Sequence, residues 1–299
     1  MLRSIDPFER KEIIVPVGTL YVVATPIGNL EDFSPRGARV LAEVDLIAAE
    51  DTRHSAKLLQ HYGVQTKVVS IHDYNERAKT PQLLEMLRAG KSIALVSDAG
   101  TPLLSDPGFH LVRAARAANV TVVPIPGPCA AIAALSVAGL PTDRFAFEGF
   151  PPPRAAARRA ALATLRTERR TMVFYESSHR IVESLSDMAD VFGADRPAAL
   201  AREITKRFET IRDGTLADLN AHLVENENER LGEFVVLIAG APEGAGDDAI
   251  TESDRVLGVL LQEVPLKEAV KLTARLTGGH KNELYDRALS IKAASSKKS

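Results

Sequence analysis

The sequence predicts an α/β protein built from two units in series, followed by a small helical module. Short apolar runs alternate with stretches of helical spacing from Gly18 onward, a pattern typical of a mainly parallel sheet. The pattern starts again after a proline-rich segment at residues 124–128, and a Gly/Asp-rich stretch at 240–249 ends it. We therefore expect two α/β domains that face each other across a cleft, where ligands commonly bind.

The first unit contains five apolar runs that predict strands, at residues 19–24, 45–49, 67–71, 91–96 and 120–125. Helical spacing separates them, as in residues 80–90 and 109–118. Ser34 followed by Pro35 predicts the N-cap and first residue of a helix over 35–44.

The second unit repeats this organisation. Further strands are expected at residues 144–150, 171–177, 197–204, 208–214 and 233–239, with helices between several of them. We divide the chain into a tail (1–16), two α/β domains (17–126 and 127–240), a linker (241–250) and a C-terminal module with a basic tail (251–299).

The C-terminal module is predicted to be a helix-turn-helix, because helical spacing flanks a Thr-Gly-Gly turn. Residues 251–299 carry nine Lys/Arg against six Asp/Glu, whereas the rest of the chain carries 28 against 33. This asymmetry indicates contact with a polyanion. A helical cap that closes a dimer or covers an edge is an equally good interpretation.

The composition excludes several classes of protein. The net charge of −2 gives no global basic field, so a nucleic-acid role must depend on local patches. One cysteine excludes a disulfide framework, and no apolar run has the length of a signal peptide or a membrane span, so we expect a cytoplasmic protein without membrane contact. The seven histidines are scattered, so we predict no essential metal site.

The stretch SDAGTPLLSDPG, at residues 97–108, lies between a predicted strand and a predicted helix, where α/β proteins hold ligands. It matches neither the dinucleotide fingerprint nor the Walker loop, and the GKS at 90–92 precedes its strand. Similar loops at 25–30 and 124–134 end two other strands, so three loops meet at one sheet edge. The alternative is a purely structural Ω-loop.

Several motifs together carry a resemblance to a known family: LYVVATPIGNLED, AAEDTRHS, SDAGTPLLSDPG, PIPGPCA, YESSHR and REITKRFET. The chain resembles the ribosomal RNA small-subunit methyltransferase I family, a branch of the tetrapyrrole-methylase-like fold, over residues 18–292. The resemblance implies two αβα domains with S-adenosylmethionine in the cleft between them, commonly in a homodimer. It also implies 2′-O-methylation of a cytidine ribose in small-subunit (16S) ribosomal RNA.

The same resemblance implies a set of cofactor-binding residues. Cys129 is expected to form pocket wall instead of acting as a nucleophile, since nothing near it in the sequence would activate its thiol. The full set is Pro26, Gly100, Thr101, Pro102, Leu104, Ser105, Asp106, Pro128, Cys129, Ala130, Tyr175 and Glu176.

A ribose hydroxyl is a poor nucleophile at neutral pH, so a nearby base would help methyl transfer. The candidates are Glu50 and Asp51, which follow a strand at the loop-bearing edge, Glu203, and Lys206 if burial lowers its pKa. An equally good interpretation of Asp51 is a helix cap.

RNA contacts are expected from basic residues, whereas the absence of Trp and the 5% aromatic content argue against an extensive stacking platform. The assembled subunit is the expected form of the RNA, because local patches could dock on a preformed surface. The alternatives are a tetrapyrrole methyltransferase and a non-enzymatic RNA-binding assembly factor. The candidate RNA-binding residues are Arg53, His54, Arg77, Arg154, Arg158, Arg159, Arg180 and Arg207.

Overall fold

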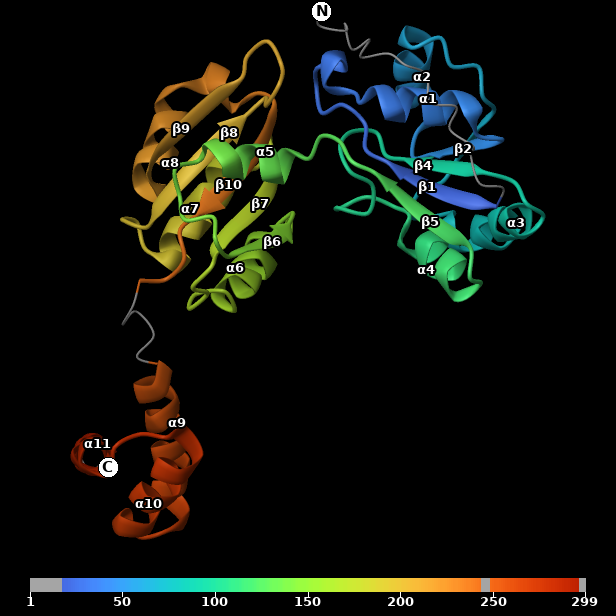
Figure 1. The fold of residues 1–299 in the computed structure, drawn as a ribbon. Helices are drawn as coiled ribbons and strands as arrows, with labels where there is room; N and C mark the ends of the chain where they lie inside the picture. The colour runs from blue at the N-terminus through green and yellow to red at the C-terminus, as the bar shows by residue number, and fades with distance from the viewer. Residues whose placement is uncertain (1–17, 243–247, 296–299) are drawn as a thin grey trace, which may run out of the picture.

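The structure, a computed structural model, describes residues 18–242 and 248–295. It contains two five-stranded sheets in separate domains and a C-terminal group of three helices (Figure 1). The predicted tail at 1–16, part of the predicted linker and the last residues of the basic tail lie outside the described residues.

The first sheet is wholly parallel, with strand order β3-β2-β4-β1-β5. All five predicted strands of this domain are confirmed, and Ser34 caps α1 as predicted, with its hydroxyl accepting from the backbone N–H of Gly37 at 2.9 Å. The strands are β1 (Thr19–Val23), β2 (Leu46–Ala49), β3 (Val68–Ser70), β4 (Ile93–Val96) and β5 (Thr121–Ile125).

Helices cover both faces of this sheet because its strands are apolar on both sides. Val40 of α1 and Leu58 of α2 pack on one face, and Leu83 of α3 and Leu111 of α4 pack on the other. The helix predicted over 80–90 begins four residues earlier, at Glu76, and contains Pro81. The helices are α1 (Pro35–Glu43), α2 (Thr52–His61), α3 (Glu76–Arg88) and α4 (Phe109–Ala117), and a short 3₁₀ turn, η1 (Leu30–Asp32), follows β1.

The second sheet has the order β6-β7-β10-β8-β9, and only the β6–β7 pair is parallel. The expectation of mainly parallel strands is therefore wrong for this domain. Two features account for this. Strand β8 leads directly into β9 through residues 203–209 with no helix between them, and β10 lies antiparallel between β7 and β8. The strands are β6 (Phe145–Gly149), β7 (Thr171–Ser177), β8 (Pro197–Arg202), β9 (Thr210–Thr215) and β10 (Glu233–Ile238).

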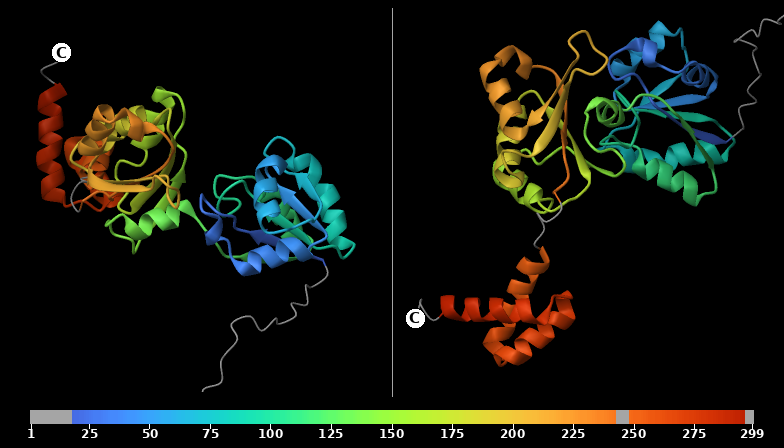
Figure 2. Two further views of the ribbon diagram at one scale, coloured as in Figure 1. Left: turned by 90° about the horizontal axis from the view of Figure 1, so that it is seen from above. Right: turned by 60° about the vertical axis from the view of Figure 1, so that its left-hand side comes forward.

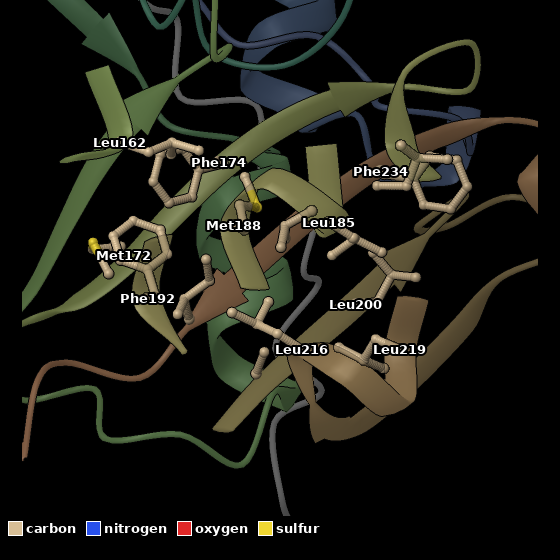
Figure 3. Close-up of a cluster of buried hydrophobic side chains, with 14 of the residues drawn as sticks. Leu162, Met172, Phe174, Leu185, Met188, Phe192, Leu200, Leu216, Leu219 and Phe234 are labelled. Carbon is tan, nitrogen blue, oxygen red and sulfur yellow. The ribbon is translucent and has the colours of Figure 1, made fainter. Parts of the chain in front are cut away.

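The main core of the second domain lies between this sheet and the three helices α6, α7 and α8. Figure 3 shows Phe174, Leu185, Met188 and Leu219 among the buried side chains that fill it. The opposite face is covered by α5, whose alanines pack on Val173 and Leu237. The helices are α5 (Ala130–Val137), α6 (Ala155–Ala163), α7 (Ile181–Phe192) and α8 (Leu216–Glu225), with a 3₁₀ turn, η2 (Glu227–Arg230), before β10.

The C-terminal module has three helices, α9 (Asp248–Glu263), α10 (Leu266–Thr277) and α11 (Lys281–Ser295). They pack on one another around Leu257, Val270 and Leu284. The right-hand view of Figure 2 shows these three helices as a separate group, apart from both sheets. Helix α9 begins inside the segment predicted as a linker, and the predicted turn lies between α10 and α11, where Gly278 has a φ of 74°.

Candidate active site

A cavity of about 400 Å³ lies between the two α/β domains, at the carboxyl edge of the first sheet. The first domain lines it with the segment after β4, and the second domain with the end of β7 and the start of β10. Parallel α/β sheets bind ligands at this edge. The predicted cleft between the domains is therefore present, and its size lies within the range of small-molecule sites.

Backbone and hydroxyl hydrogen bonds join the three predicted loops. The Thr25 N–H donates to the Gly100 carbonyl at 2.8 Å, and the Gly100 N–H donates back to Thr25 at 3.1 Å. The Thr101 hydroxyl donates to the Pro128 carbonyl at 3.0 Å. The loops after β1, β4 and β5 therefore form one structural unit, as the sequence predicted.

Strained backbone concentrates at the loops beside the cavity. Leu103 and Ser105 have φ values of 74° and 68°, and Glu203 and Thr205 have values of 50° and 66°. Non-glycine residues rarely adopt this region, and such strain persists where the surrounding structure enforces it, often at functional sites. The loop at residues 97–108 is thus held in one specific shape, which favours a ligand-binding role over a structural Ω-loop.

Three carboxylates from the first domain line the cavity: Glu50, Asp98 and Asp106. Burial raises the pKa of Glu50, one oxygen of which accepts the Asp98 N–H at 3.2 Å. Burial raises the pKa of Asp106 to about 7, helped by the negative charges of Glu50 and Asp98 and opposed by a hydrogen bond from Ser97. A cationic ligand would lower the energy of this crowded acidic group.

The second domain provides an aromatic and apolar wall. The Tyr175 ring makes edge contacts with Phe147 and Phe150, at centroid distances of 4.9 and 5.5 Å. Its hydroxyl accepts the N–H of Ala131 in the first turn of α5 at 3.2 Å, and burial raises its pKa. Ile204 and Val235 continue this wall, and Glu233 lies beside them. The side formed by the second domain is therefore mainly apolar, and the side formed by the first domain carries three carboxylates.

The structure separates the four candidate bases. Glu50 lines the cavity, whereas Asp51 caps α2. Hydrogen bonds from the Arg53 side chain and backbone hold the pKa of Asp51 well below its usual range. Asp51 therefore holds a proton poorly, and the helix-cap interpretation describes its geometry.

Lys206 and Glu203 form an ion pair, with the Lys206 Nζ 2.8 Å from Glu203 Oε1 and 2.8 Å from Glu233 Oε2. Burial acts to lower the pKa of Lys206, but these two carboxylates raise it overall. The condition under which Lys206 could act as a base is therefore not met. Burial likewise acts to raise the pKa of Glu203, but hydrogen bonds from Lys206 and the Glu233 backbone keep it lowered.

Most of the predicted cofactor residues line the cavity, and Pro26, Pro102, Pro128 and Cys129 do not. The Glu176 carboxylate points away into the second domain, where Arg180 and Ser184 bind it at 2.7 and 2.5 Å. The predicted residues that line the cavity are Gly100, Thr101, Leu104, Ser105, Asp106, Ala130, Tyr175 and Glu176.

Sequence reasoning missed several lining residues. Asp98 lies inside the quoted loop motif, so the motif itself was the signal. Phe150 lies in the segment EGFPPP, which directly precedes an arginine-rich stretch at residues 154–170. No sequence signal indicated that residues of β10 would line the cavity. The missed residues are Ile27, Asp98, Ala99, Phe150, Ser177, Ile204, Glu233, Phe234 and Val235.

The prediction that Arg158 binds RNA is wrong. Its side chain is 1% exposed, and its Nε donates to Asp187 Oδ2 at 2.6 Å. Helix α6 turns this residue toward α7, while Arg154 and Arg159 on the same helix are exposed. Arg180 is also largely occupied within the domain, by Glu176, Ser177 and the Pro151 carbonyl. The other predicted RNA-binding residues, Arg53, His54, Arg77 and Arg207, are exposed.

No helix among the described residues is long and apolar enough to span a membrane. Within the same part of the chain, no group of three or more His, Cys, Asp or Glu side chains could hold a metal ion.

Comparisons with known proteins agree with this architecture. Residues 19–220 match the family model described as tetrapyrrole (corrin/porphyrin) methylases, and residues 247–292 match the RsmI C-terminal HTH domain. The chain is thus a two-domain protein of the tetrapyrrole methylase fold with an added helix-turn-helix domain. Within that class it belongs to the ribosomal RNA small subunit methyltransferase I family.

Two relatives illustrate the extent of this match. A ribosomal RNA small subunit methyltransferase I from Pseudomonas aeruginosa is 56% identical over 273 residues, 91% of this chain and 97% of the relative. A protein of the same name from Escherichia coli O157:H7 is 51% identical over 272 residues, which are 91% of this chain and 95% of the relative.

Solved structures show the same fold at low identity. The methyltransferase CobJ superposes with a TM-score of 0.56 at 22% identity, covering 75% of this chain and 95% of its own. Cobalt precorrin-4 methyltransferase CbiF superposes with a TM-score of 0.56 at 18% sequence identity, covering 76% of this chain and 98% of its own. At these identities the likeness establishes the fold alone.

Proposed function

We propose that the chain is an S-adenosylmethionine-dependent methyltransferase that methylates the 2′-oxygen of a cytidine ribose in small-subunit ribosomal RNA. The observation that carries this proposal is the cavity between the domains, which has an acidic side and a mainly apolar side, in a chain of this family. The proposal includes a homodimer and an assembled subunit as the substrate.

The cavity fits this cofactor chemically. S-adenosylmethionine has two cationic groups, the sulfonium and the ammonium, and a flat adenine. Asp98 and Asp106 supply negative charge on one side, while Tyr175, Ile204 and Val235 supply an apolar wall on the other. When bound, the cofactor supplies an electrophilic methyl group, and the protein's task is to orient the acceptor and remove its proton.

Glu50 is the residue that we propose as the proton acceptor. Among the four predicted bases it is the one that lines the cavity, and burial raises its pKa toward the range useful for general-base catalysis. One carboxylate oxygen accepts from the Asp98 backbone, which orients the group. Lys206 is instead proposed to hold Glu203 and Glu233 at the cavity mouth as a positioning residue.

RNA is favoured over a tetrapyrrole as the acceptor by two features. The C-terminal helix-turn-helix match is to a domain named for the ribosomal RNA methyltransferase, and the curated relatives that match along nearly their full lengths carry that name. Exposed Arg53 and His54 at the start of α2 follow Glu50 closely in the chain, and exposed Arg207 follows Ile204, so both domains carry basic side chains a few residues from the cavity lining.

The experiment is transfer of radiolabelled methyl from S-adenosylmethionine to small subunits purified from a strain that lacks this gene, with the labelled nucleoside identified by mass. Labelled 2′-O-methylcytidine is the expected product, and naked ribosomal RNA tests the assembled-subunit part of the proposal. Label in another nucleoside would refute the stated specificity. Cofactor binding with no label in either RNA would refute the RNA substrate, and a tetrapyrrole acceptor would be tested next.

A further inference from the structure

A small aromatic surface lies at the carboxyl edge of the first sheet, outside the lining of the cavity, and has no role in the proposed chemistry. The Tyr74 side chain is almost fully exposed, at 98%, and Phe109 at the start of α4 is 56% exposed. The rings of His72 and His110 stand edge-on to Tyr74 and Phe109 respectively, at centroid distances of 6.2 and 5.5 Å. Rings this exposed leave their flat apolar faces available to a stacking partner.

Two contacts hold the segments of this surface together. The buried Glu76 carboxylate accepts the Leu111 N–H at 3.0 Å, which ties the start of α3 to the start of α4. The second contact is a hydrogen bond in which the Arg77 Nε donates to His110 Nε2 at 3.2 Å. The rings are therefore carried by two helix starts that are fixed to each other, instead of by independent loops.

The surface adjoins the proposed site. Residues 72–77 follow β3, whose neighbour β2 leads directly to Glu50, and the Ile71 N–H donates to the Ala49 carbonyl at 2.7 Å. The charge of Asp73 acts on both Glu50 and Asp106 in the cavity wall. On the other segment, Phe109 comes three residues after Asp106.

We propose that Tyr74 and Phe109, with Arg77 between their segments, stack on unpaired nucleobases that flank the acceptor nucleotide. Single-stranded RNA is bound in this way, by aromatic faces for the bases and arginine for the phosphates or base planes. This inference rests on the proposed function and identifies the surface that would present the acceptor strand. It is compatible with the low aromatic content, since two rings suffice for two bases.

The absence of tryptophan from the chain allows a direct test. Tyr74→Trp and Phe109→Trp each introduce a single fluorophore, to be titrated with a single-stranded oligoribonucleotide of about ten residues with a central cytidine. Phe145→Trp is the matched control, because Phe145 is 38% exposed and pairs with the start of β7, the end opposite the cavity. We expect quenching of the first two variants and none of the control.

Kinetics give the second readout. Tyr74→Ala and Phe109→Ala are expected to raise KM for small subunits about five- to a hundredfold, the range for one lost stacked base, with cofactor affinity unchanged. Tyr74→Trp should retain the wild-type KM. Absent quenching in both fluorophore variants, or an unchanged KM in both alanine variants, would overturn the inference while leaving the proposed function intact. Failure of the wild-type protein to methylate RNA would instead overturn the proposed function.

Discussion

Gly28 of the first domain lies so close to Lys206 of the second that a Cβ atom at Gly28 would stand 2.4 Å from the Lys206 Cγ. The same atom would lie 2.9 Å from the Thr205 hydroxyl and 3.3 Å from the Ile204 carbonyl. The loop after β1 therefore meets the loop after β8 with no room for a side chain. This contact joins the two walls of the cavity, since Ile27 lines one and Ile204 the other.

Gly28→Ala is expected to weaken cofactor binding by at least tenfold, because the added methyl group displaces Lys206 from its two carboxylates or separates the domains. Isothermal titration with S-adenosylmethionine measures the effect. Gly258→Ala in α9 is the control, because nothing lies within 4 Å of its added methyl group. Equal affinities for the two variants would contradict the importance of this contact.

Glu50→Gln is expected to lower kcat about 10²- to 10⁴-fold, the usual contribution of a general base, with little change in cofactor affinity. The pH–rate profile should lose its acidic limb in this variant. Asp51→Asn serves as comparison, because Asp51 caps α2 and pairs with Arg53 outside the cavity lining. A greater loss of kcat from Asp51→Asn would transfer the proposed role to Asp51.

Asp106 is expected to make cofactor affinity rise with pH through about 7, because its carboxylate form attracts a cation. The unfolded chain loses this proton near pH 4, whereas the folded protein keeps it to about pH 7. Ionisation therefore destabilises the folded protein progressively over this interval, and the loss is complete above it.

Asp106→Asn should remove both effects. Without cofactor, the variant is expected to gain up to about 4 kcal/mol over wild type in free energy of unfolding at pH 8, and much less at pH 4. Urea unfolding at the two pH values measures this, with exposed Asp143→Asn as control. A gain that is the same at both pH values would indicate a packing effect unrelated to charge.

The buried pair of Arg158 and Asp187 gives a prediction about stability. Arg158→Ala leaves Asp187 buried with only Arg159 as partner, so a loss of about 3–5 kcal/mol in free energy of unfolding is expected. Exposed Arg154→Ala should change it by less than about 0.5 kcal/mol. Thermal unfolding separates the two variants. Similar melting temperatures would show that the buried pair contributes little.

The alternation of apolar runs was enough to predict the strands, and the proline- and glycine-rich strand ends were enough to locate the site. What the sequence could not show is which partner each charged side chain finds. Arg158 and Arg159 are adjacent in an arginine-rich stretch that predicts an exposed basic face. Because consecutive residues of a helix point in different directions, Arg158 is buried against Asp187 while Arg159 is exposed. Likewise, the sequence makes Lys206 a candidate base, but in the structure its ammonium group pairs with two carboxylates.

The order in which strands pair in the second sheet could not be predicted from the sequence either. Strand β10 is last in sequence but lies in the middle of the sheet, which brings Glu233 and Val235 to the cavity. Local spacing carries no information on such non-local pairing, so these lining residues had no signal. The loop motifs, by contrast, follow their strands directly, and their position at the sheet edge follows from the parallel arrangement.

The chain passes from the first sheet to the second once, between β5 and α5, and no described strand of one sheet pairs with a strand of the other. A rotation about residues 126–129 would alter the width of the cleft without breaking a hydrogen bond of either sheet, but it would strain the Thr101–Pro128 hydrogen bond and the close contact of Gly28 with Lys206. Pro126 and Pro128 restrict the directions in which this rotation can occur. The width of the cleft, and with it the size of acceptor that can enter, therefore depends on this short crossing and on the contact of Gly28 with Lys206, in addition to the chemistry of the residues that line the cavity.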